Sequence, residues 1–111
     1  MGRTSVSVTE SALGRRMVGH RIEGMDERFK EGTVVWFQTR AVGGVSGDAI
    51  RHVWMREGKP VQTIRLPLGG PDWRTVSRKT LTHAGAWAVE ARDQDDRVLA
   101  RADFACEPSS Y

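Results

Sequence analysis

Hydrophobic and polar residues alternate with a period of two along most of the chain, which is typical of half-buried β-strands. This alternation, together with clusters of β-branched and aromatic residues, predicts strands at residues 5–9, 33–41, 50–56, 61–68, 73–81, 86–92 and 98–106. Turn sequences such as Glu57-Gly58-Lys59 and Gly69-Gly70-Pro71-Asp72 separate them. Strand signals therefore recur about every ten residues, the spacing of a β-sandwich or barrel.

Two longer segments favour the sandwich. Segment 52–61 (HVWMREGKPV) has a tryptophan strand, a glycine turn and a second strand, and segment 85–104 (GAWAVEARDQDDRVLARADF) has an aromatic strand, a polar hairpin and a partner strand. Both patterns are usual in immunoglobulin-like sandwiches. We therefore predict an all-β, immunoglobulin-like β-sandwich of about seven to eight antiparallel strands, with Trp54 buried in its core.

Chain length predicts how these strands are organised. The 111 residues fit a single β-sandwich domain over 1–111. The strand pattern is weakest in residues 1–30, where 17–22 fit a short strand and 25–29 fit one helical turn. Residues 107–111 are expected to form a frayed tail.

Charge and hydropathy argue against two classes of partner. The net charge is only +3 and the cations are interleaved with acids, so we predict no nucleic-acid partner. No apolar run approaches the ~18 residues of a membrane helix, so we predict no direct membrane insertion. The first residues also lack the apolar core of a signal peptide. We expect the chain as given to be soluble, and leave open whether the native protein is cytoplasmic or anchored to the cell envelope.

Residue types that bind metals or act as nucleophiles are scattered. The histidines at 20, 52 and 83 occur singly, and Cys106 is the only cysteine, so we predict no metal site, no cofactor and no intrachain disulfide. We expect Cys106, near the tail, to be inert. The aspartates at 93, 95 and 96 lack the glycine and glutamate of a calcium loop. Without a Gly-x-Ser-x-Gly or Ser-x-x-Lys motif, we predict no catalytic residues and no enzyme.

The strand at 73–81 concentrates cationic and hydroxyl side chains behind a tryptophan. Alternation places Arg74 and Val76 on one face and Trp73, Ser77 and Lys79 on the other. With Val76 toward the core, we expect Ser77 and Lys79 to face water. One interpretation is an anion or sugar site, because Trp73 offers a stacking face, Arg74 a planar fork, and Ser77 and Lys79 further donors.

The same strand fits a second interpretation, in which it is an edge strand that carries charge to prevent pairing with another molecule. In that case Arg74 pairs with an acid such as Asp72 or Glu90 and fixes the preceding turn.

Several fragments resemble a known family. They are IRHVW at 50–54, LPLGGPDWRTVSRKTL at 66–81, GAWAVEARD at 85–93 and VLARADF at 98–104. In this order and spacing the chain resembles the bacterial family called domain of unknown function 2914, over roughly residues 30–105. The resemblance implies no assigned activity, and a bacterial protein that is often joined to other segments or to a membrane anchor.

The resemblance also implies particular residues. The family's signature positions correspond to His52, Trp54, Trp73, Arg74, Ser77 and Lys79. The hairpin at Asp95-Asp96-Arg97 has no glycine where the family pattern has one, so we expect a looser turn there.

These observations predict a non-enzymatic binding or accessory module whose unknown ligand is a glycan or an anionic group. The predicted ligand-binding residues are Trp73, Arg74, Ser77, Lys79 and, as a further candidate, His52. A lone histidine beside a core aromatic is more often structural than functional, so both roles stay open for His52.

A second functional class rests on Trp36. Val35, Trp36 and Phe37 make both faces of one strand apolar, so either both faces are covered or one presents an aromatic patch. The alternative function is therefore a structural domain that docks on a protein partner or forms a homodimer through an aromatic sheet face. An uncharacterised hydrolase is poorly supported, because no set of acid, base and nucleophile is visible.

Overall fold

The computed structural model describes residues 6–109, which form ten β-strands and no helix. The strands are β1 (Ser7–Gly14), β2 (Arg16–Val18), β3 (Arg21–Glu23), β4 (Arg28–Lys30), β5 (Val34–Val42), β6 (Ala49–Arg56), β7 (Lys59–Pro67), β8 (Asp72–Thr80), β9 (Gly85–Arg92) and β10 (Val98–Glu107). Each predicted strand overlaps an observed one, although residue 5 lies outside the described residues. Within the described part of the chain, no helix has the length and apolarity to cross a membrane.

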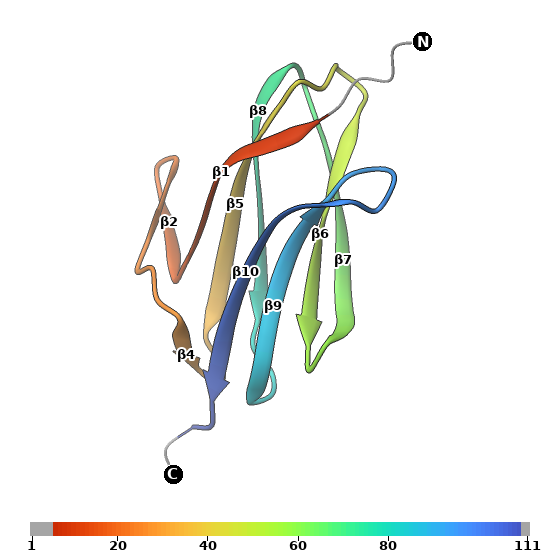
Figure 1. The fold of residues 1–111 in the computed structure, drawn as a ribbon. Coiled ribbons are helices and arrows are strands. Elements are labelled where there is room, and N and C mark those ends of the chain that lie inside the picture. Colours follow the sequence, from red (N-terminus) through yellow and green to blue (C-terminus); the bar gives the residue numbers. More distant parts are fainter. Residues whose placement is uncertain (1–5, 110–111) are drawn as a thin grey trace.

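Two sheets pack against each other as a β-sandwich (Figure 1). One sheet has the strand order β1-β5-β8, the other has the order β4-β10-β9-β6-β7, and β2 and β3 form a separate hairpin. The prediction of an all-β sandwich is confirmed. Its immunoglobulin-like subclass stays a prediction. Strands β7 and β8 are edge strands of their respective sheets, and the candidate site lies beside them.

The strand number exceeds the predicted seven to eight because three short segments near the N-terminus also pair. Residues 17–22 form parts of both β2 and β3 rather than one strand, with Gly19 in the turn at a φ of 63°. The expected helical turn at 25–29 is wrong, since β4 pairs in parallel with β10. This pairing buries Phe29, whose ring meets Phe104 edge to face at 5.6 Å.

The core lies between the two sheets and is centred on aromatic side chains. Trp54 is fully buried, as predicted, with Phe37 and Phe104 at ring-centroid distances of 6.4 and 6.3 Å in edge-to-face geometry. The rings of Trp87 and Phe104 are stacked, with their centroids 6.3 Å apart. Cys106 also lies in this core, because β10 continues through Glu107 instead of fraying. Of the predicted tail, residues 108 and 109 follow the strand, and 110 and 111 lie outside the described residues.

The hairpin between β9 and β10 is closed rather than loose. The Asp93 amide donates to the Arg97 carbonyl at 3.0 Å, and the Asp93 carboxylate accepts from the amides of Asp95 and Arg97. Asp96 takes a left-handed φ of 67°, and aspartate is among the residues that tolerate this conformation. The expectation of a looser turn is therefore wrong.

Candidate functional site

Four polar side chains and one indole form a hydrogen-bonded network inside the sandwich. His52 Nδ1 lies 2.6 Å from Ser77 Oγ, and His52 Nε2 lies 2.9 Å from Thr39 Oγ1. Trp54 Nε1 donates to Ser77 Oγ at 3.1 Å, and the hydroxyl oxygens of Thr39 and Thr75 are 2.9 Å apart. His52 and Trp54 belong to β6, whereas the three hydroxyls belong to β5 and β8. The network therefore ties the two sheets together.

The order of donors in this network selects one form of the imidazole. Ser77 Oγ accepts from Trp54, and among the described contacts His52 Nδ1 is the acceptor within reach of the Ser77 hydroxyl hydrogen, so we assign Ser77 as the donor to His52. The ring then carries its proton on Nε2 and donates to Thr39. This neutral form agrees with burial, which lowers the pKa of His52 from 6.5 to about 3.

The expected orientation of β8 is wrong, because the face that carries Ser77 is the inner one. Ser77 is 7% exposed and Thr75 is 8% exposed, whereas Val76 on the opposite face is only half-buried. Small hydroxyls can occupy the interior here because His52, Trp54 and Thr39 satisfy them. Of the predicted ligand-binding residues, His52 and Ser77 thus lie inside the sandwich.

Trp73 lies at the start of β8 and packs on the preceding turn. A β-carbon added to Gly69 would lie 2.5 Å from Cη2 of the Trp73 ring, so the indole occupies the space that the missing side chain leaves. Trp73 remains 44% exposed. The spacing of Gly69 and Trp73 in the sequence motif therefore has a packing role, with part of the indole left at the surface.

Arg74 lies on the outer face of the three-stranded sheet, in a group of four charges. Its guanidinium is 3.6 Å from Glu10 Oε1. Arg40 holds the same group together more closely: its Nε and Nη2 donate to the two oxygens of Asp72 at 2.8 and 2.6 Å, and its Nη1 donates to Glu10 at 2.7 Å. The guanidinium that binds Asp72 is therefore that of Arg40. The expected pairing of Arg74 with Asp72 or Glu90 is replaced by the longer contact with Glu10.

Lys79 is on the same face as Ser77 but nearer the end of β8, and it is half-buried. It lines a shallow recess of about 490 Å³ between the last strands of the two sheets, β7 and β8. The recess is lined by Val34, Gln62, Arg78, Lys79, Thr80 and Thr82. Among the described residues, neither Arg78 nor Lys79 forms an ion pair. The recess therefore offers cations and neutral donors without an acid in its lining.

The predicted site residues on β8 do not converge on one place. Lys79 lies six residues after Trp73, a separation of ~20 Å along an extended strand. Arg74 points to the opposite face from both. Sequence reasoning placed Lys79 among the candidates but missed Gln62, Thr80 and Thr82. Their position depends on which strands end the two sheets, and alternation does not report that.

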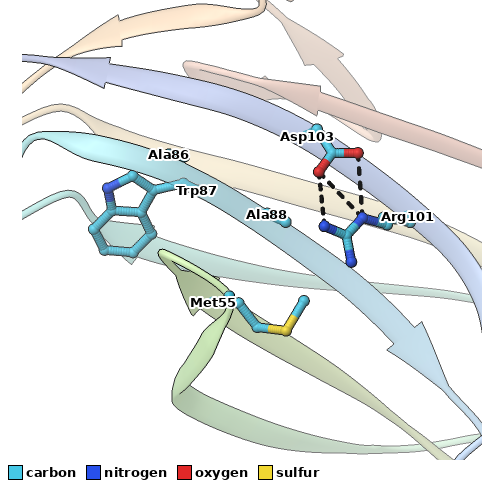
Figure 2. A pocket seen from close by; sticks show the side chains of 7 residues that line it. Met55, Ala86, Trp87, Ala88, Arg101 and Asp103 are labelled. Atoms are coloured by element: carbon cyan, nitrogen blue, oxygen red, sulfur yellow. Dashed lines mark hydrogen bonds and ion pairs between the residues drawn. The ribbon is translucent and has the colours of Figure 1, made fainter.

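A second, smaller pocket of about 130 Å³ lies on the outer face of the five-stranded sheet (Figure 2). Its charged residues, Arg101 and Asp103, bond each other through several contacts of 2.8 to 3.2 Å. Arg101 also bonds the buried carboxylate of Glu90. Because these charges are already paired, the pocket offers a ligand little beyond the small apolar surface of Met55 and Ala88.

Trp36 lies on the outer face of the three-stranded sheet, whereas its neighbours Val35 and Phe37 are fully buried. The guanidinium of Arg78 lies over the Trp36 ring, 5.2 Å from its centroid. The indole is therefore half-buried beneath a cation, so less of an aromatic patch faces outward than the sequence suggested.

The remaining candidate chemistry is dispersed. Among residues 6–109, no three His, Cys, Asp or Glu side chains gather closely enough to hold a metal ion. The Cys106 thiol is 4% exposed, and burial raises its pKa.

Comparisons with known proteins identify a family and a fold. The family described as "Protein of unknown function (DUF2914)" matches residues 47–106, which is more than half of the chain, and the chain belongs to this family. A search of curated proteins found no match. A β-glucosidase from Listeria innocua in complex with glucose has a similar fold, with 10% identity and a TM-score of 0.54 over 96% of this chain. The chain spans only 17% of that enzyme, so the similarity concerns the fold alone.

A superoxide reductase (neelaredoxin) from Ignicoccus hospitalis has a lower structural similarity to this chain. It is 14% identical with a TM-score of 0.46, over 90% of this chain and 82% of that one.

Proposed function

We propose that this member of the DUF2914 family is a non-enzymatic binding module that holds an anionic group in the recess between β7 and β8. The observation that carries the proposal is the pair of cations at the recess, Arg78 and Lys79, neither of which has an acidic partner among the described residues. The Gln62 amide and the hydroxyls of Thr80 and Thr82 add neutral donors. This is the donor set that carboxylate, sulfate or phosphate groups require.

The arrangement of the potential nucleophiles supports a role without catalysis. His52 and Ser77 are within hydrogen-bond distance, as a base and a nucleophile would be. However, His52 is fully buried, and the hydroxyl of Ser77 is occupied by both His52 and Trp54. A substrate would have to enter the packed core to reach them. The pair therefore fits a structural role.

The recess is open and shallow, which favours a chain-like ligand over a small enclosed molecule. Acidic oligosaccharides meet this requirement and supply carboxylates at regular intervals. Binding should be largely electrostatic, because the cations lie near the surface, and should therefore weaken as the salt concentration rises.

Isothermal titration with a hexamer of galacturonic acid tests the proposal, with a neutral hexamer of galactose as the ligand control. The double variant Arg78→Gln/Lys79→Gln should reduce affinity for the acidic hexamer at least tenfold. The matched control, Arg21→Gln/Arg97→Gln, removes the same charge from two exposed positions away from the recess and should retain affinity. Equal losses in both variants would indicate attraction by net charge alone and would refute a site at the recess.

A further inference from the structure

Strand β8 is an unpaired edge of the three-stranded sheet. All nine of its residues, Asp72–Thr80, pair with β5 without a register shift. No described strand pairs with its other side. Because the pairing is regular, the direction of each backbone group on β8 follows from alternation.

One hydrogen bond on each backbone group of Leu81 fixes this alternation. The Leu81 amide donates to the Thr33 carbonyl at 2.9 Å, and the Leu81 carbonyl accepts from the Gly32 amide at 2.8 Å. Both groups of Leu81 therefore face the β5 side, as do those of every second residue before it. The residues that turn their N–H and C=O groups to the free edge are Arg74, Val76, Arg78 and Thr80.

The side chains of these residues make the free edge cationic on the outer face. Arg74 and Arg78 lie four residues apart, with the half-buried Val76 between them. Arg74 has one long contact, with Glu10, and Arg78 lies over Trp36. An added strand would therefore meet two guanidinium groups on either side of one apolar position.

The same charges argue against a second copy of this chain as the occupant. Symmetric antiparallel pairing of two β8 strands about Val76 would place Arg74 of each copy directly opposite Arg78 of the other. Like charges in directly opposed positions destabilise a sheet. The other edge bordering the recess, β7, carries Lys59 and Arg65 and no acid.

We propose that β8 accepts an extended acidic peptide as an additional, antiparallel strand. The inference rests on the proposed function, since the recess behind the edge is the same, and it specifies the partner as a protein segment. Main-chain hydrogen bonds to alternate residues of β8 would supply affinity, and side chains would supply selectivity. The preferred segment has acids at two positions four apart, opposite Arg74 and Arg78, and an apolar residue midway, opposite Val76.

The synthetic peptide acetyl-Thr-Glu-Thr-Val-Thr-Glu-Thr-amide has this pattern and serves as the probe. Residue-resolved amide exchange by NMR should show that the peptide slows exchange at Arg74, Val76, Arg78 and Thr80 by at least tenfold. The amides of Thr75, Ser77 and Lys79 already face β5 and should change little. A peptide bound only by charge would not produce this alternation, so its absence would overturn the inference.

Two peptide modifications test the main-chain pairing on the unaltered protein. Methylation of the valine nitrogen removes a donor that faces β8 and should weaken binding at least tenfold. Methylation of the next threonine nitrogen alters an amide that points away and should be tolerated better. Equal effects of the two methylations would contradict strand addition.

A charge exchange tests selectivity. The variant Arg74→Glu/Arg78→Glu should lose the acidic peptide and gain the analogue in which lysines replace the glutamates. Failure of the folded variant to bind the lysine analogue would contradict pairing at these two positions.

The result with the acidic oligosaccharide separates this inference from the proposed function. Recess-dependent binding of the galacturonic acid hexamer without peptide binding would overturn strand addition and leave the anion site standing. Loss of both would overturn both. Sedimentation tests whether the chain forms a concentration-dependent dimer. If such a dimer protected the same four amides, a second copy of the chain would occupy the β8 edge, and the inference would be overturned.

Discussion

His52 Nδ1 on β6 and Ser77 Oγ on β8 lie 2.6 Å apart, across the interface of the two sheets. The two residues are 25 positions apart in sequence and come from two of the fragments that resemble the family, so these fragments meet in one buried contact. Trp54, from the same fragment as His52, donates to the same hydroxyl. Of the residues first predicted for a surface site, His52 and Ser77 instead link the two sheets.

Loss of the Ser77 hydroxyl should destabilise the fold. Ser77→Ala leaves the buried Trp54 indole N–H and His52 Nδ1 without this partner, and an unsatisfied buried polar group costs roughly 1–3 kcal/mol. We expect the free energy of unfolding in urea to fall by about 2 kcal/mol or more. Thr80→Ala, at an exposed position on the same strand, should change it by less than about 0.5 kcal/mol. Similar values for the two variants would mean that the network contributes little.

His52 should make stability depend on pH. The unfolded imidazole takes up a proton near pH 6.5, whereas burial lowers the pKa of folded His52 to about 3. Between these values the unfolded state binds more protons, so stability is full above pH 6.5 and falls as the pH decreases. For this group alone the loss at pH 5 is about 2 kcal/mol.

NMR tests the same prediction directly. The imidazole signals of His52 should stay at their neutral positions from pH 8 to pH 5, and the ring should carry its hydrogen on Nε2. A midpoint between pH 6 and 7 for His52 in the folded protein would contradict the buried, neutral assignment.

Arg40 and Arg74 should respond differently to substitution by lysine, although they lie on the same sheet face. Arg40 contacts both oxygens of Asp72 and one oxygen of Glu10, a geometry that needs the planar fork of a guanidinium. Arg74 makes one ion contact at 3.6 Å. We expect Arg40→Lys to lower Tm more than Arg74→Lys in thermal melts at low salt, with the difference shrinking at high salt. A larger effect at Arg74 would show that its contacts with the neighbouring strands matter more than the Arg40 fork.

The strands could be predicted from the sequence because alternation reports burial directly where the inner residues are apolar. Val35 and Phe37, for example, are fully buried on β5. Alternation gave the wrong face on β8, because there the inner residues are hydroxyls whose partners come from β5 and β6. Hydropathy does not show that Ser77 will meet His52.

Predicting the candidate site requires knowledge of strand order. Lys79 was identified from its chemistry, but the recess exists because β7 and β8 end different sheets beside each other. Residues such as Gln62 and Thr82 carry no sequence signal of their own. The parallel pairing of β4 with β10 could not be predicted from the sequence either, because a strand of three residues is too short to show an alternating period.

The packing of Trp73 on Gly69 provides a test of why the motif pairs these residues. An alanine at position 69 would place its β-carbon 2.5 Å from the indole, so Trp73 must swing away, and crowding of this kind costs roughly 1–3 kcal/mol. The φ of Gly69 is not in the left-handed region, so the cost should come from the indole and not from the backbone. In a Trp73→Ala background, Gly69→Ala should therefore be nearly neutral. Urea unfolding of the parent, the two single variants and the double variant gives the coupling between the two positions. An equal cost of Gly69→Ala in both backgrounds would show that position 69 needs glycine for a reason other than the tryptophan.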